Sequence, residues 1–106
     1  MKTLHLMLKS RWFGMIACGD KKEEYRARTP YWIKRLCIRA VCREDCFDAD
    51  KVCFTPKDYT HICFHLGYTN TTILVELKGI TQGVGNPDWG APEEEVFILK
   101  LGDRIN

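Results

Sequence analysis

Two neighbouring segments with strong strand character limit the folds open to this chain of 106 residues. Residues 61–66 (HICFHL) are apolar and strand-like, and the run from Thr71 to Ile80 is rich in β-branched residues. The short polar segment from Gly67 to Asn70 separates them and is typical of a turn. Two strands joined in this way form a hairpin, so the chain is expected to build a sheet that contains an antiparallel pair.

Three further segments are expected to be strands. Residues 3–8 alternate so that their leucines share one face, and residues 95–101 form an apolar strand near the end of the chain. The polar segment 21–27 lies between two helix signals and is expected to be a short strand with a functional face. The alternation predicts that the sheet interior is made by Ile73, Val75, Leu77, Phe97, Leu99 and Leu101.

Helix signals occur twice in the first half. Ser10 is an expected N-cap for a helix over residues 11–18, and Gly19 stands where helices often end in a left-handed residue. Thr29–Pro30 opens a second helix, whose apolar spacing continues to about Glu44. The large apolar side chains on these helices, expected in the core, are Trp12, Phe13 and Trp32.

Two connecting segments and the chain length complete the expected architecture. Residues 45–59 have no clear period and are expected to be a long connection, with one short element around residues 52–54. Residues 81–92 hold glycines and prolines and are expected to be a structured loop. The length fits one domain, residues 1–106. The order of elements predicts an α+β fold, a small and mostly antiparallel β-barrel with two helices in the N-terminal half.

Composition and charge exclude several classes of protein. The chain is 45% hydrophobic and 28% charged, as globular proteins are, which argues against a disordered chain or a membrane protein. The net charge is only +2, yet most basic residues precede residue 44, so a local basic face is expected. Residues 1–8 do not resemble an export signal. We therefore expect a cytoplasmic protein whose six cysteines are reduced thiols.

One short segment carries a resemblance to a known family. Gly19, Lys21, Glu24 and Arg26 fill a G-x-K-x-x-E-x-R pattern that directly follows a strand and a helix. This arrangement resembles the ASCH domain family of the PUA-like superfamily. The resemblance spans nearly the whole chain, apart from a family-atypical loop or helix extension at about residues 37–60.

The resemblance implies a PUA-like β-barrel with a cleft lined by the motif, which binds RNA or a modified nucleoside or nucleotide. One branch of similar fold hydrolyses N4-acetylcytidine with a lysine, a threonine three positions later and a distant glutamate. Lys21 matches that lysine, but Glu24 stands at the threonine position. A binding module is therefore the leading hypothesis. The alternative is a hydrolase, either a nucleoside amidohydrolase or a ribonuclease, with Lys21 and Glu24 as catalytic residues.

The chemistry of the motif leaves two interpretations open. In a strand, Glu24 and Arg26 share one face, where Arg26 can hold a phosphate or carboxylate in a fork that Glu24 orients. Lys21 comes beside Glu24 only through a bulge, or else it lies on the turn before the strand. In the other interpretation, Glu24 and Arg26 form a structural ion pair while Lys21 and Lys22 are solvated.

Aromatic residues in loops are further ligand-binding candidates. Trp89, inside the glycine- and proline-rich loop, is placed to stack on a base or to plug the end of the barrel. Tyr68 in the hairpin turn is a similar candidate. The acidic run Glu93–Glu95 offers a distant acid or base to a hydrolase, or simply a solvated strand entry.

The cysteines and histidines of the chain are either metal ligands or buried core residues. The spacing Cys42-x3-Cys46-x6-Cys53 does not match the paired cysteines of common zinc sites. His61, Cys63 and His65 share one face of a strand and offer ligands, but buried thiols and core histidines are more common. We therefore expect no metal and no cofactor, and the sequence does not define the oligomeric state.

Overall fold

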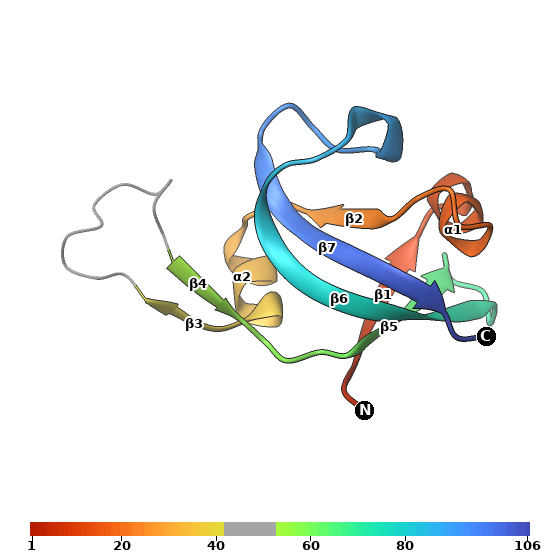
Figure 1. Ribbon diagram of the computed structural model, residues 1–106, viewed down its shortest axis with the longest axis horizontal. Coiled ribbons are helices and arrows are strands. Elements are labelled where there is room, and N and C mark those ends of the chain that lie inside the picture. The colour runs from red at the N-terminus through yellow and green to blue at the C-terminus, as the bar shows by residue number, and fades with distance from the viewer. Residues whose placement is uncertain (42–52) are drawn as a thin grey trace.

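The structure is a computed structural model that describes residues 1–41 and 53–106. It is a small α+β protein in which a curled five-stranded sheet forms a half-barrel accompanied by two helices (Figure 1). In the described part of the chain, neither helix has the length and apolar character needed to span a membrane. In chain order the elements are β1 (Thr3–Leu8), α1 (Ser10–Ala17), β2 (Glu23–Arg26), α2 (Pro30–Leu36), β3 (Cys37–Val41), β4 (Cys53–Pro56), β5 (His61–Leu66), β6 (Thr72–Val84), the short 3-10 helix η2 (Pro87–Trp89) and β7 (Glu95–Arg104).

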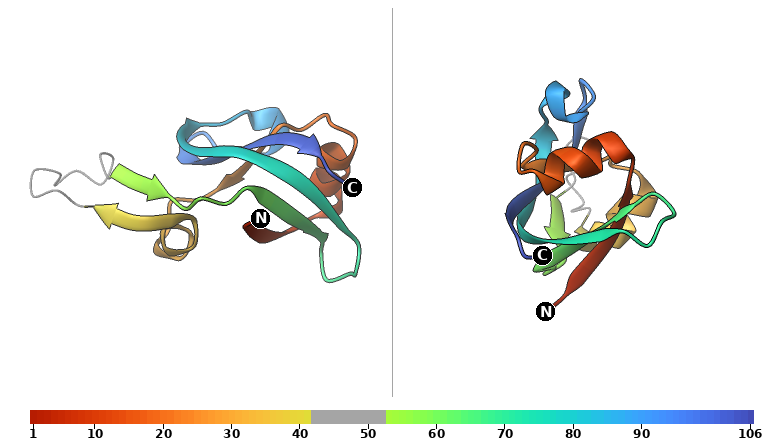
Figure 2. Two further views of the ribbon diagram at one scale, coloured as in Figure 1. Left: turned by 60° about the horizontal axis from the view of Figure 1, so that its bottom comes forward. Right: turned by 90° about the vertical axis from the view of Figure 1, so that its right-hand side faces the viewer.

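The main sheet has the strand order β1-β5-β6-β7-β2. The predicted hairpin of β5 and β6 is confirmed, and the other neighbours are antiparallel except for β1 and β5, which pair in parallel. Irregular register between β6 and β7 at residues 75–79 bends the two long strands, and both curve around the interior (Figure 2). The parallel pair places the first strand of the chain beside residues 61–66.

The predicted interior faces of the late strands are confirmed. Ile73 and Val75 of β6 are each 2% exposed, and Leu99 of β7 is fully buried. Burial of a side chain of this size contributes about 1.5–3 kcal/mol. The predicted loop beginning at residue 81 is wrong for residues 81–84, because β6 continues there as the partner of β7 residues 95–98.

Helix α1 lies one residue earlier at both ends than predicted, and the predicted left-handed Gly19 after it is confirmed. Gly19 adopts a φ of +86°, its N–H donates to the carbonyl of Ile16, and the Asp20 N–H donates to the carbonyl of Met15. This is a Schellman ending, which glycine favours because it has no Cβ. The expected cap at Ser10 is wrong: Ser10 is the first helical residue, and Lys9 precedes it without a side-chain hydrogen bond.

Helix α2 is shorter than its apolar spacing indicates. The Thr29 hydroxyl accepts a hydrogen bond from the N–H of Trp32 at 3.4 Å, which confirms the predicted cap. The predicted continuation toward residue 44 is wrong for residues 37–41, which form β3 and pair with β4. The β-branched residues of that segment favour a strand once a partner strand is present. Residues 42–52, including Cys42 and Cys46, lie outside the described residues.

Strands β3 and β4 form a separate two-stranded sheet that extends away from the half-barrel (Figures 1 and 2). The short element expected around residues 52–54 corresponds to β4. The N–H of Lys57 donates to the carbonyl of Leu36 at 2.8 Å, which ties the end of β4 to the end of α2. The proposed extension at residues 37–60 therefore begins with β3 and includes β4, which ends at Pro56.

Two arginines donate hydrogen bonds to carbonyls of β1, and one of them, Arg26, joins the two edges of the main sheet. Strands β1 and β2 are its two edge strands. Arg26 of β2 donates from Nη2 to the carbonyl of Met7 on β1 at 3.3 Å, and Arg35 of α2 donates from Nη2 to the carbonyl of His5 at 2.6 Å. Arg26 thus spans the open side of the half-barrel, next to the candidate site.

Candidate functional site

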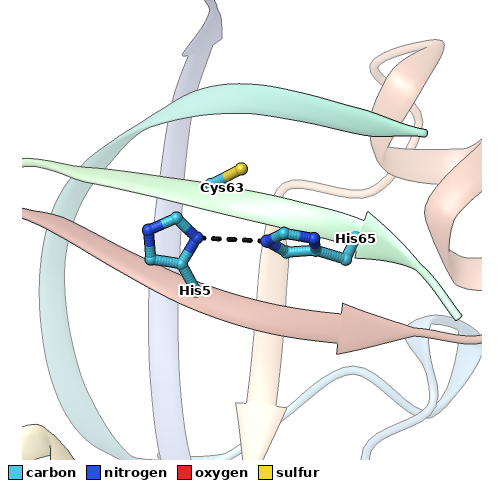
Figure 3. Close-up of side chains that lie close together, drawn as sticks. All are labelled: His5, Cys63 and His65. Atoms are coloured by element: carbon cyan, nitrogen blue, oxygen red, sulfur yellow. Dashed lines mark hydrogen bonds between the residues drawn. The ribbon is translucent and has the colours of Figure 1, made fainter. Parts of the chain in front are cut away.

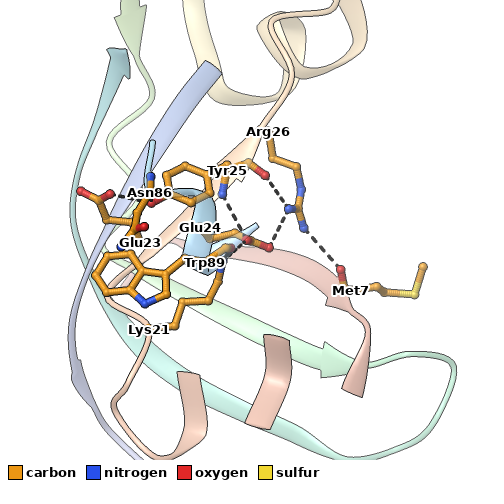
Figure 4. Close-up of polar contacts among 8 residues, drawn as sticks. All are labelled: Met7, Lys21, Glu23, Glu24, Tyr25, Arg26, Asn86 and Trp89. Atoms are coloured by element: carbon orange, nitrogen blue, oxygen red, sulfur yellow. Dashed lines mark hydrogen bonds and ion pairs between the residues drawn. The ribbon is translucent and has the colours of Figure 1, made fainter. Parts of the chain in front are cut away.

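A buried cluster of three charged side chains forms the base of the site (Figure 4). Lys21 lies on the turn before β2 and is 2% exposed, and Glu24 in β2 is 4% exposed. The Lys21 Nζ lies 3.0 Å from Glu24 Oε1, and Arg26 Nη1 lies 2.6 Å from Glu24 Oε2. One carboxylate therefore joins two cations, and the ionised cluster carries a net positive charge.

Lys21 is enclosed by the residues around it. Its ammonium donates to the carbonyl of Trp89 and lies 4.9 Å from the ring centre of Trp12 and 5.0 Å from that of Tyr25. Burial lowers the pKa of Lys21, and the carboxylate of Glu24 opposes that shift. The interpretation in which Lys21 is solvated is wrong, since 1% of its side chain is exposed.

Arg26 is the member of the cluster that reaches solvent. Its Nη1 donates to Glu24 and to the carbonyl of Tyr25 at 2.8 Å, and its Nη2 donates to the carbonyl of Met7. A guanidinium has five N–H donors. Within the described residues these contacts engage both Nη1 hydrogens and one Nη2 hydrogen. In the part of the chain that the structure describes, the Nε hydrogen and the second Nη2 hydrogen therefore remain for a ligand.

Tyr25 fixes the loop between β6 and β7 from the opposite face of β2. Its hydroxyl donates to Glu23 Oε1 at 2.7 Å and accepts from the N–H of Asn86 at 3.0 Å. Burial raises the pKa of Tyr25 to about 12. A small apolar cluster holds the loop over β2: Trp89 packs against Tyr25, Ala91, Val96 and Ile98.

A pocket of about 420 Å³ opens beside Glu24 and Arg26. This volume falls in the range of ligand pockets, roughly 300–1,000 Å³. All three tryptophans of the chain, which come from α1, α2 and η2, lie in its wall. The lining residues are Met7, Leu8, Lys9, Trp12, Glu24, Tyr25, Arg26, Trp32, Trp89 and Gly90.

The three tryptophan rings differ in what covers them. Trp12 has the Arg11 guanidinium at 4.7 Å in addition to Lys21, and Trp32 has Arg26 at 5.1 Å and Arg35 at 5.4 Å. No cation lies over the Trp89 ring in the part of the chain that the structure describes. Trp89 is therefore the ring best placed to stack on a planar ligand.

A second pocket of about 450 Å³ adjoins the first. Met7, Arg26 and Trp32 line both pockets, and the second continues along β1 and α2. Its lining residues are His5, Leu6, Met7, Arg26, Tyr31, Trp32, Arg35 and His65. Arg26 therefore stands between two hollows, each with aromatic and cationic walls.

The sequence-predicted site residues fall in three places. Glu24, Arg26 and Trp89 line the first pocket, whereas Lys21 lies behind its wall. Tyr68 is 96% exposed in the turn between β5 and β6 and is not among the lining residues of either pocket. The acidic run at residues 93–95 is exposed, and Glu95 pairs with Arg28 at 3.5 Å.

Sequence reasoning gave no site role to several residues of the pocket, among them Lys9, Trp12 and Trp32. Trp12 and Trp32 were expected in the core, and they do pack against it while also lining the pocket. Lys9, the residue between β1 and α1, had no signal beyond its charge. Connections between elements often carry binding residues, and the place of Lys9 between a strand and a helix was the available clue.

The fold and the site together define a small α+β half-barrel with an aromatic pocket beside a buried, positively charged cluster. A scan against protein-family models found no match for the chain, and searches of curated proteins and of solved structures found none either.

Proposed function

We propose that this protein is a cytoplasmic binding module for RNA or a nucleotide, of the ASCH type within the PUA-like superfamily. One observation carries the proposal: all three tryptophans of the chain surround one pocket that also presents Arg26. Aromatic rings that stack on bases and cations that contact phosphates are the shared features of single-stranded nucleic-acid sites.

The free groups of the pocket match the parts of a nucleotide. Trp89 offers a ring face to a base, and the remaining Nε and Nη2 hydrogens of Arg26 suit a phosphate or the acceptor edge of a base. Lys9 is exposed at the pocket rim and adds a second positive charge. Glu24 orients Arg26 and is itself occupied by two cations.

The same contacts favour binding over hydrolysis. A lysine nucleophile needs a free lone pair in reach of the substrate. The Lys21 ammonium instead donates to Glu24 and Trp89, faces two aromatic rings and lies behind the pocket wall. Glu24 is similarly engaged by both of its oxygens. The cluster therefore supports a positioning role for Lys21 and Glu24.

A titration with fluorescently labelled single-stranded RNA and with mononucleotides at low salt tests the proposal. Trp89→Ala is expected to weaken binding roughly 5- to 150-fold, since stacking on one base contributes about 1–3 kcal/mol. Tyr68→Ala is the matched control, because Tyr68 is an exposed aromatic residue that does not line the pocket. An equal effect of the two variants, or no binding of either ligand by the parent, would overturn the proposal.

A second pair of variants tests the electrostatic part. Lys9→Ala is expected to reduce the slope of log Kd against log salt by about 0.7, the value for one phosphate contact to a single strand. Lys78→Ala is the control, since Lys78 is exposed on β6 and outside the pocket.

Incubation with N4-acetylcytidine and with RNA completes the test. If the parent hydrolyses either compound and Lys21→Ala does not, the protein is a hydrolase and the proposed binding role is wrong.

A further inference from the structure

Three potential metal ligands gather on the outer face of the main sheet (Figure 3). His5 of β1 lies opposite Cys63 of β5, and His65 follows two residues further along β5. The buried leucines of β1 and the buried Ile62 and Phe64 alternate with these residues, so all three point to the outer face.

The spacing of the ligand atoms is close to that of a tetrahedral metal site. The potential ligand atoms of His5, Cys63 and His65 all lie within 4.8 Å of one another, and His5 Nδ1 is 3.1 Å from His65 Nε2. Two nitrogens bound to zinc at about 2.0–2.1 Å in tetrahedral geometry lie roughly 3.3 Å apart. Small side-chain rotations therefore suffice to place all three around one ion.

The donor set selects the class of ion. Two imidazoles and a thiolate suit zinc and related transition metals, whereas calcium and magnesium require oxygen ligands. The thiol of Cys63 is free, and within the described residues it makes no hydrogen bond that metal binding would break. Among the side-chain contacts of residues 1–41 and 53–106, metal binding would replace the hydrogen bond between the two imidazole rings.

The surroundings leave room for a fourth ligand. His5 and His65 both line the second pocket of about 450 Å³, which gives a water molecule access to an ion held between them. His61, the third histidine of the chain, does not belong to the cluster, since its Nδ1 hydrogen-bonds the Thr60 hydroxyl at 2.8 Å. Three protein ligands with water in the fourth position are an arrangement that tetrahedral zinc adopts in open protein sites.

We propose that His5, Cys63 and His65 bind one zinc ion on the outer face of the β1–β5 pair, with water as the fourth ligand. This site does not depend on the proposed nucleotide pocket. RNA binding by metal-free protein would not contradict the zinc site, and zinc binding is expected to persist in the Trp89→Ala variant.

Metal titration of the full chain tests the site. Chelator-treated protein is titrated with zinc alone by calorimetry, and with cobalt as an optical probe. One equivalent of cobalt is expected to produce the intense d–d bands of a tetrahedral ion and a thiolate charge-transfer band. Cys63→Ser and His5→Ala are each expected to weaken zinc binding by more than about a hundredfold, since even changes to outer-shell partners cost about 10- to 100-fold.

Matched controls separate this site from other thiols and histidines. Cys18→Ser removes an exposed free thiol, and His61→Ala removes a histidine from the same face of β5. Both are expected to retain the parent affinity and the cobalt spectrum, and circular dichroism checks that every variant is folded. The proposal is overturned if the parent binds no zinc, or if the Cys63→Ser and Cys18→Ser variants bind it equally.

Discussion

Replacement of Glu24 with glutamine should destabilise the protein severely, because it removes the only carboxylate between two cations in the buried cluster. At 3.0 Å and an effective dielectric constant of about 20, the Lys21–Glu24 attraction is on the order of 5 kcal/mol. Desolvation offsets part of this gain. Breaking a buried pair by removing one partner typically costs about 3–5 kcal/mol, and we expect a loss of that size for Glu24→Gln.

Replacement of Lys21, the other member of the pair, should reduce the free energy of unfolding by less. Lys21→Met keeps an unbranched side chain of similar length and leaves Glu24 paired with Arg26 at 2.6 Å. Its expected cost is about 1–3 kcal/mol, chiefly for the lost charged hydrogen bonds. The double variant should be at least as stable as Glu24→Gln alone, because it no longer holds an unpaired cation in the interior.

Urea denaturation measures these free energies of unfolding, with tryptophan fluorescence as the signal because all three tryptophans surround the cluster. Circular dichroism provides an independent signal for the same transition. The reasoning is refuted if Glu24→Gln costs less than about 1 kcal/mol, or if the two single costs simply add in the double variant.

Three further predictions concern the walls of the pocket. Gly90→Ala should cost about 1–3 kcal/mol and weaken ligand binding, because a Cβ at φ +94° is strained and would lie 2.8 Å from Trp12; denaturation and RNA titration measure both effects. Thr29→Ala should cost about 0.5–2 kcal/mol in urea denaturation through the lost cap on Trp32. Tyr25 has its pKa raised to about 12, so its folded state keeps a proton that the unfolded chain loses from pH 10 upward. The stability that Tyr25 contributes should therefore be complete below pH 10 and decline by about 3 kcal/mol up to pH 12, seen as a difference between the parent and Tyr25→Phe in denaturation at each pH.

Local signals were enough for the strands and for one helix start. The alternation in residues 61–66 and the β-branched run after residue 71 are properties of the strands themselves. Strand β5 forms over residues 61–66 as expected, and β6 covers most of the expected run but continues to Val84. The cap at Thr29 is likewise a contact within four residues. The end of α2 was not predictable in this way, because the apolar spacing after Leu36 suits a helix and a strand alike, and the pairing with β4 decides.

The candidate site depends on contacts between distant segments, and sequence patterns record those poorly. Glu24 and Arg26 share a face as the alternation predicts, but the burial of Lys21 depends on Trp12 and on the carbonyl of Trp89. The His5–His65 contact joins residues 60 positions apart through the parallel pairing of β1 and β5. The pairing of first and fifth strands has no local signature, so only the β5 half of that cluster was visible.

The arginine bridges on β1 have a consequence for how copies of the protein meet. An edge strand with free carbonyls invites a strand from a second molecule to add to the sheet. Arg26 and Arg35 already occupy the outward carbonyls of Met7 and His5, so an incoming strand would find these acceptors taken. At the opposite edge, β2 offers only four residues. The same side chains that frame the pockets thus protect the half-barrel from self-association through its edges.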